Sequence, residues 1–105
     1  MVVRSRDAKK RQFKGITFDL LAVGEKTMLT RMTFKAGDVV PPHGHPNEQT
    51  GYVLSGRIRI TCAAFDETLE PGDTYSVPAG MDHSAKAIED TVVLDFFVPP
   101  REEYR

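Results

Sequence analysis

The three histidines of the chain have the spacing of residues that bind one metal ion. His43 and His45 are two residues apart in a segment rich in glycine and proline, and His83 follows forty residues after His43. Imidazole is the commonest protein ligand for a transition metal. The pattern therefore predicts a bound divalent ion at the centre of the function. A polar loop with exposed histidines is the alternative interpretation.

The residues around the histidine pair indicate how such a site could be built. Side chains alternate between the two faces of an extended strand, so His43 and His45 point to the same side, about 6–7 Å apart along the strand. Gln49 shares their phase, whereas Glu48 has the opposite phase. Prolines on both flanks stiffen the segment and reduce the entropy that is lost when the ligands are ordered. Ligand type alone allows Mn, Fe, Co, Ni, Cu or Zn.

The elements that must position these residues are short strands. Runs rich in Val, Ile, Thr, Phe and Tyr are separated by Gly or Pro, and no segment after the first dozen residues has a persuasive 3.6-residue period. Strands are predicted at residues 16–23, 27–35, 39–40, 50–54, 57–64, 74–77, 84–88 and 91–98. The segment from Glu70 to Asp73 is typical of a type II turn, with Pro71 and Gly72 at its centre. Short strands at regular spacing predict an all-β sandwich or barrel.

The last predicted strand carries a second set of candidate residues. Asp95 interrupts the most apolar run of the chain and shares one face with Phe97, whereas the other face is wholly apolar. If the face of Asp95 lines the metal cavity, Asp95 is placed for general acid–base catalysis and Phe97 for packing on a substrate. Asp95 could equally be a solvent-facing residue of an alternating strand. Arg101, which follows two prolines, is either solvated or folds over the barrel mouth to hold a substrate carboxylate.

The motif spacing resembles that of the cupin superfamily over nearly the whole chain. The first cupin motif is matched by Gly37, His43, His45, Gln49 and Gly56. The second is matched by Gly72, Pro78, Gly80 and His83. The resemblance implies a small barrel of two sheets, the double-stranded β-helix or jelly roll, with one divalent metal (Mn, Fe, Co, Ni or Zn) inside it.

The same resemblance implies four metal ligands: His43, His45, Gln49 and His83. Two residues depart from the family pattern, because Gln49 replaces the usual glutamate and Ala87 replaces the asparagine that commonly closes the second motif. A one-residue bulge would bring Glu48 inward, so the fourth ligand stays open between Gln49 and Glu48, with Gln49 favoured. A shell of three imidazoles and one amide leaves the charge of the ion uncompensated, which favours an anionic small-molecule substrate.

The end of the chain is similar to one group within this superfamily. Residues 43–56 and 94–104 resemble the small cupins of pectin and alginate degradation, which convert 4,5-unsaturated monouronates to linear keto sugars. In that group the residues that match Asp95, Phe97 and Arg101 line the active site. The resemblance implies that Asp95 and Arg101 are catalytic, that Phe97 and Arg101 bind the substrate, and that the protein is a homodimer. An iron dioxygenase and a non-catalytic sugar sensor are the alternative functions.

Length and composition limit the number of domains, the partners and the cellular location that can be expected. The 105 residues predict one domain, with a basic N-terminal extension at residues 1–14 and the barrel at residues 15–105. A net charge of −1 gives no reason to expect a nucleic-acid partner. No apolar stretch approaches the ~20 residues that span a bilayer, and the single cysteine cannot form an internal disulfide. We therefore expect a cytoplasmic protein without a membrane contact.

Overall fold

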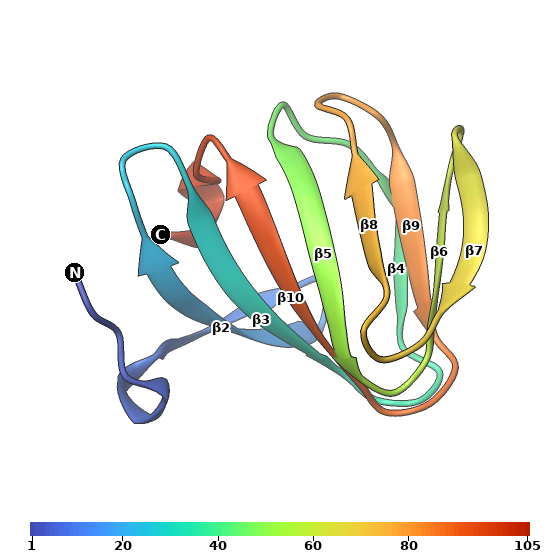
Figure 1. Cartoon of the computed structure of the whole chain (residues 1–105), viewed down its shortest axis with the longest axis horizontal. Helices are drawn as coiled ribbons and strands as arrows, with labels where there is room; N and C mark the ends of the chain where they lie inside the picture. The colour runs from blue at the N-terminus through green and yellow to red at the C-terminus, as the bar shows by residue number, and fades with distance from the viewer.

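A computed structural model describes the whole chain, residues 1–105, which is almost entirely β-structure (Figure 1). The strands are β1 (Lys9–Phe13), β2 (Ile16–Val23), β3 (Met28–Phe34), β4 (Val39–His43), β5 (Glu48–Ser55), β6 (Ile58–Cys62), β7 (Phe65–Leu69), β8 (Thr74–Val77), β9 (His83–Ala87) and β10 (Thr91–Val98). Two short 3-10 turns lie near the ends, η1 (Ser5–Asp7) and η2 (Glu102–Tyr104). Neither has the length or the apolar content that crossing a bilayer requires.

The strands form two antiparallel sheets that face each other. One sheet has six strands in the order β1-β2-β3-β10-β5-β8, and the other has four in the order β4-β9-β6-β7. From β3 onward the chain passes repeatedly from one sheet to the other, so that the two orange strands in Figure 1, β8 and β9, belong to different sheets. The all-β, double-sheet barrel that the sequence predicts is confirmed.

The core lies between the two sheets and is built from the inward face of each strand. Burial alternates along β5 and β10, so that every second side chain points into the barrel. The most deeply buried apolar side chains come from both sheets: Phe18, Met28, Val53, Ile58, Val77, Val93 and Phe97. This apolar core fixes which face of each strand is turned inward, and therefore which polar residues must share the interior.

Strand register brings residues that are distant in the sequence side by side. In the four-stranded sheet, β4 pairs with β9 so that His43 lies opposite His83. In the six-stranded sheet, β5 lies between β8 and β10, and Gly51 pairs with Tyr75 on one side and with Asp95 on the other. The candidate site is formed by residues at these two strand pairings.

Three predicted strands, at residues 16–23, 74–77 and 91–98, have the bounds of β2, β8 and β10. Two observed strands, β1 and β7, escape prediction because each lies at the edge of a sheet and carries charged residues. The basic segment 1–14 thus supplies an edge strand, which pairs with β2 through a tight turn. Lys14 and Gly15 take positive φ angles of 49° and 82° in that turn, which match the twist of a hairpin.

Candidate metal centre and active site

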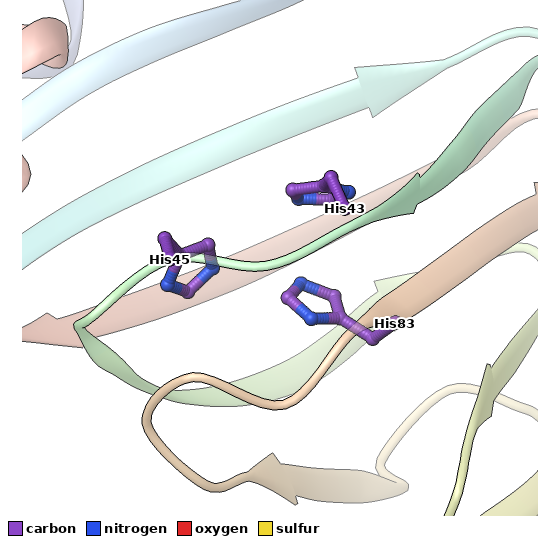
Figure 2. A group of neighbouring side chains, drawn as sticks. All are labelled: His43, His45 and His83. Carbon is purple, nitrogen blue, oxygen red and sulfur yellow. The ribbon is translucent and has the colours of Figure 1, made fainter.

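Three imidazoles converge between the sheets, as Figure 2 shows. His43 ends β4, His45 lies in the connection to β5, and His83 opens β9. One ring nitrogen from each residue lies within 4.8 Å of the other two. The rings of His43 and His83 have centroids 4.4 Å apart because the two residues are paired across neighbouring strands. The three-histidine cluster that the spacing predicts is present and is able to hold a metal ion.

Each imidazole is oriented by a backbone carbonyl two residues away. The Nδ1 atom of His43 lies 3.1 Å from the carbonyl oxygen of Pro41, that of His45 lies 2.9 Å from Asn47, and that of His83 lies 3.0 Å from Met81. A carbonyl oxygen only accepts, so each Nδ1 carries the proton and donates it. Each Nε2 atom is left with a free lone pair, which is the tautomer that a metal-ligating histidine needs.

Burial keeps these imidazoles neutral. It lowers the pKa of His43 from 6.5 to about 4. Burial, followed by the positive charge of Arg101, lowers the pKa of His45, and burial lowers the pKa of His83. Because only the neutral imidazole can donate a lone pair to a metal, these shifts maintain the binding form at neutral pH.

Gln49 lies beside the cluster and fits as a fourth donor. Its Oε1 atom is 3.0 Å from Nε2 of His45, and its Nε2 atom donates to the hydroxyl of Tyr75 at 2.8 Å. Since Nδ1 of His45 carries the proton, Oε1 and the facing Nε2 are both acceptors without a proton between them. Two ligands in cis positions at about 2.1 Å from one ion are about 3 Å apart. The facing lone pairs therefore fit a shared cation, whereas Glu48 is exposed and points away from the cluster.

Asp95 lies on the inner face of β10, with 6% of its surface exposed. The solvent-facing alternative for this residue is therefore wrong, and it is the wholly apolar face of β10 that turns outward. The hydroxyl of Tyr75 donates a hydrogen bond to the Asp95 carboxylate. Burial raises the pKa of Asp95 from 3.8 to about 6, although the bond from Tyr75 opposes the shift. Phe97, on the same face, packs its ring edgewise against His45 at 5.7 Å.

Arg101 is buried although it lies beyond the last strand. Its Nε atom donates to Glu103 at 2.6 Å and one terminal nitrogen, Nη1, donates to the hydroxyl of Tyr104 at 2.8 Å. The guanidinium carbon lies 5.1 Å, 5.3 Å and 4.2 Å from the ring centres of Phe13, Phe97 and Tyr104. The other terminal nitrogen, Nη2, has no hydrogen-bond partner within the chain. The tail thus folds over the barrel and leaves part of the guanidinium free.

A cavity of about 40 Å³ connects these groups. Every predicted site residue except His45 lines it: His43, Gln49, His83, Asp95, Phe97 and Arg101. Four aromatic residues that the sequence does not single out also line it: Phe13, Phe34, Tyr75 and Tyr104. The shared phase of Tyr75 and Val77 in β8 is a signal that could have placed Tyr75 inside. Phe13 and Tyr104 lie in terminal segments, where polar and apolar residues do not alternate and the sequence does not predict which side chains are buried.

The sequence and the fold were compared with those of known proteins. The family model of the cupin domain matches residues 30–98, so the chain belongs to the cupin family. The structure of KdgF from Halomonas sp. is similar over 100% of this chain and 98% of that chain, with a TM-score of 0.91 and 28% sequence identity.

Curated relatives are similar over shorter stretches. A germin-like protein, subfamily 1 member 1, of Arabidopsis thaliana is 36% identical over 61 residues, which are 52% of this chain and 28% of that protein. Oxalate decarboxylase OxdC of Bacillus subtilis is 26% identical over 80 residues, 71% of this chain and 21% of that protein. The chain therefore spans about a quarter of the length of the curated relatives that it matches.

The fourth ligand can be identified with two neighbouring substitutions. We expect Gln49→Ala to weaken the binding of Co²⁺ or Zn²⁺ by at least ~10-fold, because it removes the buried oxygen that faces His45. Glu48→Ala is the matched control and should bind the metal as the unaltered protein does. Calorimetric titration of the metal-free proteins measures both affinities. Loss of affinity in the Glu48 variant alone would support the bulge that brings Glu48 inward.

The buried carboxyl of Asp95 predicts a pH-dependent effect on stability. In the metal-free protein, Asp95 is protonated in both folded and unfolded states below pH 3.8, whereas above pH 6 the folded state must bury its charge. The rise of the pKa from 3.8 to about 6 corresponds to roughly 3 kcal/mol. Asp95→Asn should therefore leave the free energy of unfolding unchanged well below pH 3.8 and raise it by up to roughly 3 kcal/mol above pH 6. Urea unfolding across this range tests the prediction, and a difference that does not vary with pH contradicts it.

Proposed function

We propose that this chain is a metal-dependent cupin enzyme that opens the ring of a 4,5-unsaturated monouronate during the breakdown of pectin or alginate. The observation that carries the proposal is the position of Asp95, an ionisable carboxyl buried in the cavity that His43, His83 and the buried Arg101 also line. The resemblance of residues 94–104 to the ring-opening cupins supports the substrate class. So does the likeness to KdgF from Halomonas sp., which extends over the whole chain.

Arg101 is suited to bind the carboxylate of such a substrate. Its guanidinium is buried, is held between aromatic rings and has a terminal nitrogen without a partner in the chain. A guanidinium forms charge-assisted bonds with a carboxylate, which are stronger than bonds between neutral groups. Phe97, whose ring lies beside both His45 and Arg101, would pack against the sugar.

Asp95 is suited to move the proton that ring opening requires. The anomeric hydroxyl loses its proton as the bond between C1 and the ring oxygen breaks, and C4 of the resulting enol gains a proton as the keto group forms. The reaction is an isomerisation, so it needs neither an oxidant nor a reductant. A carboxyl with a pKa of about 6 can both accept and return a proton near neutral pH.

A divalent metal would be held by His43, His45, His83 and the amide oxygen of Gln49. When bound, it supplies Lewis-acid stabilisation of negative charge that develops on a substrate oxygen. The chain's own residues then determine selectivity, because Arg101 and Phe97 orient the sugar and Asp95 exchanges the proton. We also propose that the protein acts in the cytoplasm, where its single cysteine, Cys62, stays reduced.

We further propose a homodimer formed through the outer face of β5 and β10. Four apolar side chains are exposed there, at between 39% and 45% of their surface: Tyr52, Leu54, Phe96 and Val98. β5 and β10 are neighbours in the six-stranded sheet, so these side chains form one patch. A contiguous apolar patch on the surface of a small protein marks an interaction site.

The proposed activity predicts that the metal-loaded protein consumes an unsaturated galacturonate or mannuronate monomer. The ultraviolet absorbance of the ring double bond should disappear without oxygen consumption. Asp95→Asn should lower kcat at least ~100-fold because it removes the proton carrier, and Arg101→Lys should raise KM at least ~10-fold because it removes the planar fork. Absence of turnover with Mn, Fe, Co, Ni and Zn would exclude the substrate. Oxygen uptake with Fe²⁺ would favour a dioxygenase, and saturable binding without turnover would favour a sensor.

The dimer proposal predicts a change of mass with one substitution. Phe96→Lys places a charge in the centre of the apolar patch and should convert the dimer to a monomer in light scattering. Ile88→Lys is the control, because Ile88 is similarly exposed but lies in the turn after β9. A protein that is monomeric without any substitution would refute the proposal.

A further inference from the structure

Tyr75 reaches from the edge of the six-stranded sheet to the centre of the site. It lies on β8, whereas its hydrogen-bond partner Asp95 lies on β10, and β5 separates the two strands. The side chain therefore crosses an entire strand before its hydroxyl meets the carboxylate. On the way, the hydroxyl accepts a hydrogen bond from Nε2 of Gln49 at 2.8 Å. One side chain thus links the candidate proton carrier to the candidate fourth metal ligand.

Gly51 makes this crossing possible. It is paired with Tyr75 on one side and with Asp95 on the other, so it occupies the point of β5 over which the tyrosine ring passes. Its φ angle is not in the positive range, so the backbone does not require a glycine. A Cβ atom at this position would overlap the ring of Tyr75 and lie 2.7 Å from the carboxylate of Asp95. Glycine weakens the interior of a strand and is expected where other groups approach closely.

The direction of the hydrogen bonds determines how Gln49 is oriented. The hydroxyl of Tyr75 donates its only proton to Asp95, so toward Gln49 it can only accept. The nitrogen of the Gln49 amide must therefore face Tyr75, and the oxygen of that amide must face His45. Without the hydroxyl, the Gln49 nitrogen loses its acceptor at Tyr75, while the unprotonated Nε2 of His45 remains an acceptor that attracts it. The nitrogen, which cannot ligate a metal, could then turn toward the imidazoles.

We propose that Tyr75, admitted by Gly51, is a positioning residue that holds the oxygen of Gln49 toward the metal and the carboxyl of Asp95 toward the substrate. Tyr75 acts through these two groups and does not itself exchange a proton with the substrate. The part of the proposal that concerns Asp95 rests on the proposed ring-opening function. The part that concerns Gln49 depends only on metal binding.

The test removes one hydroxyl and keeps the aromatic ring. In Tyr75→Phe, we expect metal affinity to fall by about 10–100-fold, the range for loss of a partner of a metal ligand. The visible absorption spectrum of the Co²⁺-loaded protein should change in the same way as in Gln49→Ala. With unsaturated monouronate, kcat should fall at least ~10-fold while KM stays within about two-fold of its original value. The matched control is Tyr52→Phe, which removes a hydroxyl on the outer face of β5, outside the cavity, and should change none of these quantities.

A second comparison separates positioning from general loss of structure. Adding Tyr75→Phe to Asp95→Asn should lower kcat no further than Asp95→Asn does alone, because Tyr75 acts through the carboxyl. The proposal is overturned if Tyr75→Phe has the metal affinity and the Co²⁺ spectrum of the unaltered protein, or if its effect on kcat adds fully to that of Asp95→Asn. If no monouronate is converted even by the unaltered protein, the proposed function fails. The affinity and the spectrum then still decide the role of Tyr75 toward Gln49.

Discussion

The site depends on one electrostatic constraint: several unprotonated hydrogen-bond acceptors face one another inside an apolar barrel. Three carbonyl oxygens hold the Nδ1 protons of the histidines, which turns the Nε2 lone pairs toward one another. The amide oxygen of Gln49 joins them at 3.0 Å from His45. Such an arrangement is unfavourable by itself, because acceptors that face one another repel and are removed from water. A cation held by these groups would replace the repulsion with attraction.

The surrounding charges are consistent with this constraint. A buried arginine loses its hydration, and Arg101 recovers part of that free energy through Glu103, the hydroxyl of Tyr104 and three aromatic faces. Its positive charge helps to keep the nearby imidazole of His45 unprotonated. The same charge opposes the rise in the pKa of Asp95 that burial produces. One guanidinium therefore lowers the pKa of both the imidazole of His45 and the carboxyl of Asp95.

Much of this arrangement is predictable from the sequence, because it follows from local patterns. The alternation of side chains places His43, His45 and Gln49 in one phase, and runs of β-branched and aromatic residues mark most strands. Alternation does not show which of the two faces of a strand is buried, so the sequence alone does not determine whether Asp95 is buried or exposed. In the structure the fully apolar face of β10 turns outward, and the inner face carries Asp95 and Phe97 beside the cluster. The crossing of Tyr75 over Gly51 is also invisible in the sequence, since it depends on which strands become neighbours.

The position of the matched cupin domain along the chain has an evolutionary consequence. Residues 30–98 contain all four candidate metal ligands. Arg101 lies outside that stretch, and so do Phe13 and Tyr104, whose rings pack against its guanidinium. Under the proposed function, the metal-binding residues and most of the side chains around the substrate-binding guanidinium are therefore encoded in separate parts of the gene. Point changes or exchanges of the terminal segments could diversify the accepted ligand while the three-histidine cluster is retained. A single ancestral barrel can in this way give rise to descendants with unrelated substrates.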